Sequence, residues 1–177
     1  MPAEKEHPEP RETLLDAECS FDELCLKAEK IALNLIARAE QNSFGLKMKL
    51  KRKKIDSSVV NTVVKGLLDR GLLDDSRFAV LWLRSRLAQG RDRSPNRMLV
   101  SLAQRGIGRD ISLKALKKVL DEETEYNLLL KYIEKACFSE TLKACPPRPE
   151  ITRIVLKNEG FSSEMIDQYF DQYFDSS

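Results

Sequence analysis

The sequence predicts an all-α fold, a tandem array of three three-helix repeats that forms an elongated, curved molecule. Apolar residues recur at helical spacing along most of the 177 residues, and no segment alternates convincingly with the period of two that marks a strand. Seven glycines and seven prolines are too few for a sheet-rich fold full of tight turns. The chain also repeats itself three times, which is the pattern of a helical array.

The repeat is clearest around the second and third helices expected in each copy. Three segments align with one another: Leu50–Ile55, Leu102–Ile107 and Leu156–Phe161. After each segment, apolar side chains follow at four, eight, nine and twelve positions, which places them on one face of a helix. An earlier helix in each copy begins its apolar i, i+4, i+5 pattern at Ile31, Phe78 and Leu128. We therefore expect repeats at residues 28–74, 75–122 and 123–177.

Boundary residues agree with this division. Gly71 follows a helical run, at a place where a residue in the left-handed conformation commonly ends a helix. Asp74 or Asp75 can accept hydrogen bonds from the free N–H groups that open the next helix. Residues 1–27, which are acidic and contain three prolines, are expected to form a disordered tail.

The residue inventory argues against an enzyme. The single histidine, His7, lies between Glu6 and Pro8 in the expected tail, so no catalytic Ser-His-Asp or Cys-His arrangement can be built around it. No glycine-rich phosphate-binding motif occurs. The four cysteines lack zinc-ligand spacing, although a disulfide between Cys137 and Cys145 is left open. We expect no catalytic residue, no metal and no cofactor.

Charge is distributed unevenly along the chain. Residues 31–120 hold twenty Lys and Arg against seven Asp and Glu, a net charge of +13, whereas residues 1–30 carry −5 and residues 121–177 carry −6. The near-neutral total of +2 therefore hides a basic middle between acidic ends. A basic block of this size favours a polyanion or an acidic protein surface as partner, with a solvated helical surface as the alternative.

The most distinctive stretch surrounds the first helix of the second repeat. Gly71–Ala79 reads G-L-L-D-D-S-R-F-A, followed by Arg84-Ser85-Arg86 and then by L-A-Q-R-G-I at Leu102–Ile107. Together with the A-L-N-L-I-A-R-A-E opening at Ala32–Glu40, these positions resemble the RecX family of bacterial regulatory proteins. The resemblance covers roughly residues 28–177 and is strongest over the first two repeats.

The resemblance implies a regulator that is not itself an enzyme. Family members bind along RecA–DNA filaments, inhibit ATP hydrolysis and strand exchange, and favour loss of the filament. We accordingly expect a cytoplasmic, monomeric RecA inhibitor that modulates recombination and DNA repair in the SOS response, with direct contact to DNA left open. No membrane partner is expected, because no apolar run approaches the roughly 18 residues of a membrane span. The alternative is an autonomous helical DNA-binding protein that acts without RecA.

The candidate partner-binding residues are basic and come from the first two repeats. Lys47, Lys51 and Lys54 fall at i, i+4 and i+7, opposite Leu46 and Leu50, in a segment where six of eight residues are basic. Their mutual repulsion favours a partner anion. The remaining candidates belong to the second repeat: Arg84, Arg86, Arg91, Arg93, Arg97 and Arg105.

A second set of residues is assigned to structure. For Arg77 an ion pair at a repeat junction is favoured over a partner contact, although Arg77, Arg84 and Arg91 would share one helical stripe in a long enough helix. Phe78 and Trp82 occupy positions that are apolar or aromatic in the other repeats, so core packing is favoured over base stacking. The structural motif comprises Asp74, Asp75, Arg77, Phe78 and Trp82.

Overall fold

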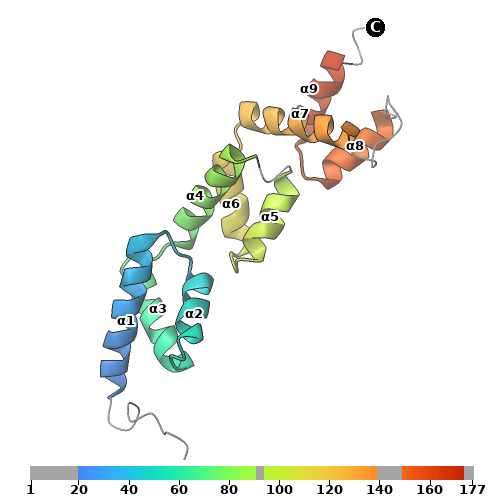
Figure 1. Ribbon diagram of the computed structural model, residues 1–177. Helices are drawn as coiled ribbons and strands as arrows, with labels where there is room; N and C mark the ends of the chain where they lie inside the picture. The colour runs from blue at the N-terminus through green and yellow to red at the C-terminus, as the bar shows by residue number, and fades with distance from the viewer. Residues whose placement is uncertain (1–19, 91–93, 139–148, 174–177) are drawn as a thin grey trace, which may run out of the picture.

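The computed structural model describes residues 20–90, 94–138 and 149–173 (Figure 1). All regular secondary structure in this part of the chain is helical, which confirms the predicted all-α class. The helices are α1 (Phe21–Arg38), α2 (Ser43–Arg52), α3 (Ser57–Asp69), α4 (Asp75–Ala88), α5 (Pro95–Ala103), α6 (Arg109–Val119), α7 (Glu122–Phe138), α8 (Pro149–Asn158) and α9 (Ser163–Tyr173). They follow one another along an elongated molecule, with α1 and α9 towards its opposite ends.

Helix α1 begins earlier than expected. Ser20 Oγ accepts a hydrogen bond from Asp22 N at 3.3 Å, and Ser20 N donates to Glu23 Oε2 at 3.2 Å. This reciprocal arrangement is a capping box, which satisfies N–H donors that a helix N-terminus otherwise leaves free. The prediction that residues 1–27 form a disordered tail is therefore wrong for 21–27, which are helical, while residues 1–19 lie outside the described chain.

Side-chain caps also set the starts of later helices. Asp56 caps α3. Asp74 Oδ1 caps α4 by accepting hydrogen bonds from Ser76 N at 2.8 Å and Arg77 N at 3.0 Å. Between these helices, Gly71 has a φ of 66°, the left-handed conformation predicted for the residue that follows α3. The chain reverses here because glycine adopts this conformation without steric cost.

The nine helices of the described chain form three groups of three. In the first group α1 and α2 pack on α3, in the second α4 and α5 pack on α6, and in the third α7 and α8 pack on α9. We propose that these groups are the three repeats read from the sequence, divided near residues 74 and 122, with α1 extending the first of them back to Phe21.

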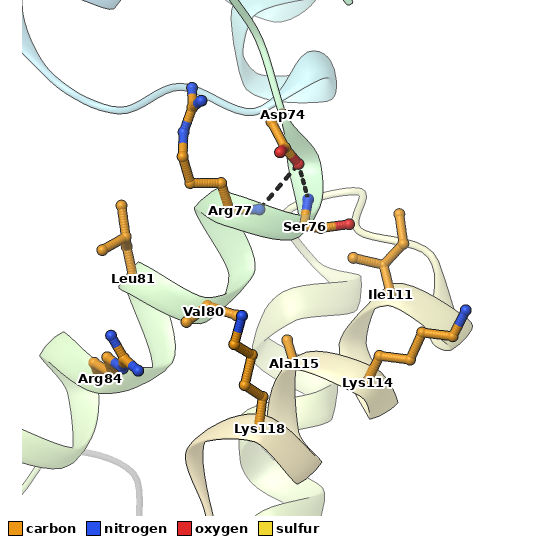
Figure 2. A pocket seen from close by; sticks show the side chains of 10 residues that line it. All are labelled: Asp74, Ser76, Arg77, Val80, Leu81, Arg84, Ile111, Lys114, Ala115 and Lys118. Atoms are coloured by element: carbon orange, nitrogen blue, oxygen red, sulfur yellow. Dashed lines mark hydrogen bonds between the residues drawn. The ribbon is translucent and has the colours of Figure 1, made fainter. Parts of the chain in front are cut away.

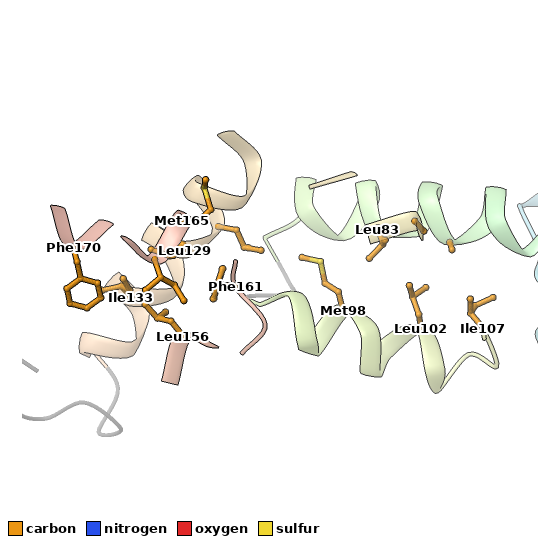
Figure 3. Close-up of a cluster of buried hydrophobic side chains, with 14 residues drawn as sticks. Leu83, Met98, Leu102, Ile107, Leu129, Ile133, Leu156, Phe161, Met165 and Phe170 are labelled. Atoms are coloured by element: carbon orange, nitrogen blue, oxygen red, sulfur yellow. The ribbon is translucent and has the colours of Figure 1, made fainter. Parts of the chain in front are cut away.

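Buried apolar side chains divide into two clusters. One belongs to α1–α3 and includes Leu46, Leu50 and Val64, each 0% exposed. The other runs through α4–α9 (Figure 3). Met98 of α5 and Phe161, just before α9, lie where the two halves of this second cluster meet. The second and third groups therefore share one core, whereas the first group has its own.

The two junctions between groups share one geometry. At the first, Asn42 Nδ2, just before α2, donates to Arg105 O at 2.6 Å, in the turn after α5. At the second, Asn96 Nδ2 in α5 donates to Asn158 O at 2.5 Å, and Asn96 N donates to Glu159 O at 2.9 Å. In both cases the start of the second helix of one group meets the end of the second helix of the next group.

Both of these turns require glycine. Gly106 has a φ of 75° and Gly160 a φ of 89°, in the left-handed region that side chains with a Cβ rarely adopt. A Cβ on Gly106 would overlap Phe44, and one on Gly160 would lie 2.7 Å from Asn96 Oδ1 and 3.3 Å from Asn96 N. The recurring glycine is thus explained by the close approach of the preceding group as well as by its own backbone.

Candidate partner-binding surface

Helix α2 places two leucines in the core and presents basic side chains, together with Phe44 and Met48, on its outer surface. Leu46 and Leu50, one turn apart, are 0% exposed. Of the predicted lysines, Lys47 is half-buried and Lys51 is exposed on the same helix. Lys54 lies beyond the end of α2 with a φ of 62°, the one non-glycine residue of the described chain at positive φ. The prediction that all three lysines lie along one helix is therefore wrong at Lys54.

The α2 cations have few local partners. Lys49 Nζ donates to Gln41 Oε1 at 2.6 Å. Within the described ranges, no acidic side chain forms an ion pair with Lys47, Lys51 or Lys54. The negative end of the helix dipole explains part of the basic excess, at about 0.3–1 kcal/mol for each cation in the last turn. Lys47 lies before that turn, so the dipole does not account for its place.

Arg86 and Arg105 meet at Trp82. The guanidinium carbon of Arg105 lies 4.5 Å from the centre of the Trp82 ring, and that of Arg86 lies 5.2 Å from it. Arg105 Nη1 also donates to Ser101 O at 2.8 Å. Trp82 is half-buried and packs against the α4–α9 cluster. The indole is therefore part of the core and also packs against two cations. Each cation–π contact contributes about 0.5–1 kcal/mol at partly exposed sites.

Two residues of the D-D-S-R-F segment, Asp74–Phe78, complete the first junction. Asp75 Oδ1 accepts a hydrogen bond from Ser43 N at 2.7 Å, and Asp75 Oδ2 accepts one from Ser43 Oγ at 2.6 Å. Ser43 opens α2, so its N–H has no partner within that helix. Arg77 Nε donates to Glu40 Oε1 at 2.8 Å, an ion pair at the junction where we expected one. Phe78 is half-buried against the α4–α9 cluster.

Arg84 faces a pocket between α4 and α6 that the sequence did not reveal (Figure 2). Arg84 and Arg86 are two residues apart, which places them on nearly opposite faces of α4. Lys114 and Lys118 line the same pocket from α6. We did not single out these two lysines in the sequence, although their i, i+4 spacing places them on one helical face. The pocket thus brings one predicted cation together with two that were missed.

The remaining predicted arginines belong to the segment around α5. The Arg97 side chain is 65% exposed, and its Nε lies 3.9 Å from Glu159 Oε2. Glu159 also accepts a hydrogen bond from Ser94 Oγ. This acidic residue of the third repeat therefore joins the second and third helix groups at the second junction. Arg91 and Arg93 lie outside the described residues, and α4 ends before Arg91.

Shifted pKa values occur at a cap and at a junction. Hydrogen bonds from the side chain and then the backbone of Ser58 lower the pKa of Asp56, which caps α3. Burial, followed by the negative charge of Glu159, raises the pKa of Tyr132. The first shift follows from the cap of α3 and the second from burial between helices, and neither group lies among the predicted partner-binding cations.

The described segments also lack a metal-site cluster and a membrane-spanning helix. There, no His, Cys, Asp and Glu side chains gather in threes as a metal site would need. None of the helices described has both the length and the apolar character to cross a bilayer. The Cys137–Cys145 pairing falls outside the described side chains.

The chain is similar in sequence to curated proteins and in fold to solved structures. The regulatory protein RecX of Treponema pallidum subsp. pallidum is 35% identical over 111 residues, which are 63% of this chain and 67% of that protein. The regulatory protein RecX of Halorhodospira halophila is 31% identical over 137 residues, 76% of this chain and 81% of the relative. The crystal structure of RecX from Lactobacillus salivarius matches with a TM-score of 0.66 and 19% identity, covering 88% of this chain and 99% of that one. No protein-family model matches the chain.

The fold and the surface define a class of protein, an elongated all-helical array that carries cations on exposed helix faces. Similarity to curated relatives identifies the family within that class. The chain belongs to the RecX family of regulatory proteins. The name of these relatives supports a regulatory role for this chain.

Proposed function

We propose that this chain binds RecA recombinase filaments in the cytoplasm, as a monomer, and inhibits their ATP hydrolysis and strand exchange. Membership of the RecX family supports the regulatory part of the proposal. One observation carries the binding part: among the described residues, the predicted lysines of the α2 segment have no acidic partner. A recombinase filament on DNA offers such cations both acidic protein surface and phosphates.

The proposed contact runs along the first two helix groups. An elongated array touches several protomers at once, and each contact raises the effective concentration for the next. Bound in this way, the array opposes the conformational cycle that ATP turnover needs and disfavours the addition of protomers. The proposed partner-binding set is Lys47, Lys51, Lys54, Arg84, Arg86, Arg91, Arg93, Arg97 and Arg105.

The single-stranded-DNA-dependent ATPase rate of the cognate RecA tests this function. The protein is titrated in below one copy per recombinase protomer, and inhibition is expected there because one array restrains several protomers. Absence of inhibition, even at excess protein and low salt, would contradict the proposal. The alternative of an autonomous DNA-binding protein predicts tight binding to naked DNA that weakens steeply with salt.

Charge reversal on α2 tests the surface itself. The variant Lys47→Glu/Lys51→Glu is expected to raise the concentration needed for inhibition about tenfold or more, because each reversal turns an attraction into a repulsion. The matched control is Lys30→Glu/Lys65→Glu, which changes the net charge equally at exposed residues of α1 and α3. An equal loss in both variants would show that net charge, rather than α2, determines inhibition.

A further inference from the structure

A groove between α4 and α6 combines positive charge with apolar walls. Its volume is about 510 Å³, enough to receive a few side chains of a ligand. The residues that matter for its chemistry are Val80, Leu81 and Arg84 on α4, and Ile111, Lys114 and Lys118 on α6 (Figure 2). It therefore has cationic and apolar groups on both walls.

The positive charge of the groove is not neutralised nearby. In the part of the chain that the structure describes, none of Arg84, Lys114 and Lys118 forms an ion pair. Asp74, at the rim, already accepts hydrogen bonds from two backbone N–H groups of α4. Arg77 extends away from the groove to its acidic partner in the first helix group. Three cations are thus left to attract an anionic ligand.

The apolar walls decide what kind of anion fits. Leu81 is 46% exposed, Val80 and Ile111 are half-buried, and Ala115 lies buried between the cations of α6. A phosphate or sugar bound here would leave the exposed apolar surface without an apolar partner. A peptide with an apolar side chain next to its carboxylates would cover that surface and pair with the cations at the same time.

Comparison of the three repeats shows that helix packing does not require these cations. The position of Arg84 holds Ala37 in the first repeat and Glu134 in the third. The position of Lys114 holds Thr62 and Gln168, and that of Lys118 holds Gly66 and Gln172. All three helix groups have the same helix order, so the cationic groove is a property of the second group alone. Its charge fits a role in binding better than a role in folding.

We propose that the α4–α6 groove binds an acidic peptide segment of a protein partner, one that carries an apolar side chain beside its carboxylates. Arg84, Lys114 and Lys118 pair with the carboxylates, and Leu81 and Ile111 contact the apolar side chain. This site goes beyond the proposed function and does not depend on it, because its ligand is recognised by chemistry that can be tested without recombinase.

Fluorescence anisotropy with short labelled probes tests the proposal on the full chain. The first probe is the peptide Glu-Asp-Leu-Phe-Asp-Glu, and the second replaces its Leu-Phe pair by Ser-Ser. The third probe is a short oligothymidylate. Binding is expected in the order first, second, third at moderate salt, since only the first probe satisfies both the cations and the apolar walls.

Two matched pairs of variants locate the site. Lys118→Glu is expected to weaken binding of the first peptide about tenfold, because an attraction becomes a repulsion, whereas Lys117→Glu leaves it nearly unchanged. Lys117 is an exposed neighbour on α6 that does not line the groove. Leu81→Ser is expected to abolish the preference for the first peptide over the second. Leu113→Ser, at a similarly exposed leucine outside the groove, retains this preference.

Three results would overturn the proposal. Equal losses in Lys117→Glu and Lys118→Glu would assign binding to net charge. Tighter binding of the oligothymidylate, with displacement of the peptide, would make the groove a nucleic-acid site. Absence of binding by the first peptide at low salt, with the helical circular dichroism of the wild type intact, would show that the groove is not a peptide site.

Discussion

The two junctions between helix groups use the same contact but differ in what surrounds it. At the first, polar side chains complete the contact: Asp75 bonds to Ser43, and Arg77 pairs with Glu40. At the second, the apolar cluster of α4–α9 continues from one group into the next. Backbone geometry therefore determines how groups stack, and the core determines which groups unfold together. We expect α1–α3 to be one cooperative unit and α4–α9 to be another.

Removal of equivalent core leucines should separate these units. Leu50, Leu102 and Leu156 occupy the same place in the three repeats and are 0%, 0% and 1% exposed. Each change to Ala is expected to destabilise its unit by about 2–5 kcal/mol. Leu50→Ala should raise hydrogen exchange in α1–α3 alone, whereas Leu102→Ala and Leu156→Ala should each raise it throughout α4–α9. Equal exchange in all nine helices after Leu50→Ala would mean that the described chain is one unit.

Alanine at the junction glycines should have the next largest effect. Gly106→Ala is expected to cost about 2–4 kcal/mol, since the left-handed backbone is strained and the new Cβ would lie 2.5 Å from Phe44 Cβ, which no rotamer change can move away. Gly160→Ala should cost less, about 1–2 kcal/mol, because its shortest contacts are with Oδ1 and Cγ of Asn96, which rotation of that side chain moves, while Asn96 N lies 3.3 Å away. Denaturant unfolding measures both losses. Gly71→Ala, with open space around it, is the control for backbone strain alone.

Asp75→Ala tests the polar junction. It removes two hydrogen bonds to Ser43 and leaves an N–H at the start of α2 without a partner, so a loss of about 1–3 kcal/mol is expected. Hydrogen exchange in α2 should increase while α8 stays unchanged. Asp69→Ala, an exposed acid at the end of α3, is the matched control. An increase in α8 as large as that in α2 would contradict the proposed division into two units.

Lys54→Gly should have the smallest effect, and it should be stabilising. Lys54 occupies the position of Gly106 and Gly160 and has the same positive φ. Glycine removes this strain, but it also gives the unfolded chain more freedom, so the net gain is expected to be below about 1 kcal/mol. Thermal unfolding of the first unit measures it. A loss of stability would show that the Lys54 side chain makes a stabilising contact that outweighs the strain.

Local signals in the sequence predicted the helices well. The period of the apolar residues, the cap at Asp74 and the turn at Gly71 each depend on a few neighbouring residues, and the structure has all three. The start of α1 was missed for a different reason. Its capping box at Ser20 and Glu23 is also local, but the acidic, proline-containing segment before it indicated disorder.

The arrangement of the candidate partner-binding surface was less accessible from the sequence, because it depends on contacts between residues far apart in the chain. Asn42 and Arg105 are separated by 63 positions, and no feature of either segment predicts that the two are in contact. The approach of Arg86 and Arg105 to Trp82 likewise follows from how α5 packs on its neighbours. Lys114 and Lys118 were not predicted because the charge of α6 alone does not show that this helix faces Arg84 across a pocket.

The positive φ of Lys54 has a consequence for self-assembly. The contact between successive groups is head-to-tail, and a contact of that kind, repeated between molecules, builds open-ended fibres. In the turns after α5 and α8, Gly106 and Gly160 leave room for the preceding group. In the turn after α2, Lys54 has a Cβ and a charged side chain at the same position. A second molecule that approached this end with its last group would meet the obstacle that Gly106 and Gly160 avoid. We therefore expect Lys54 to disfavour the stacking of a second molecule at this turn.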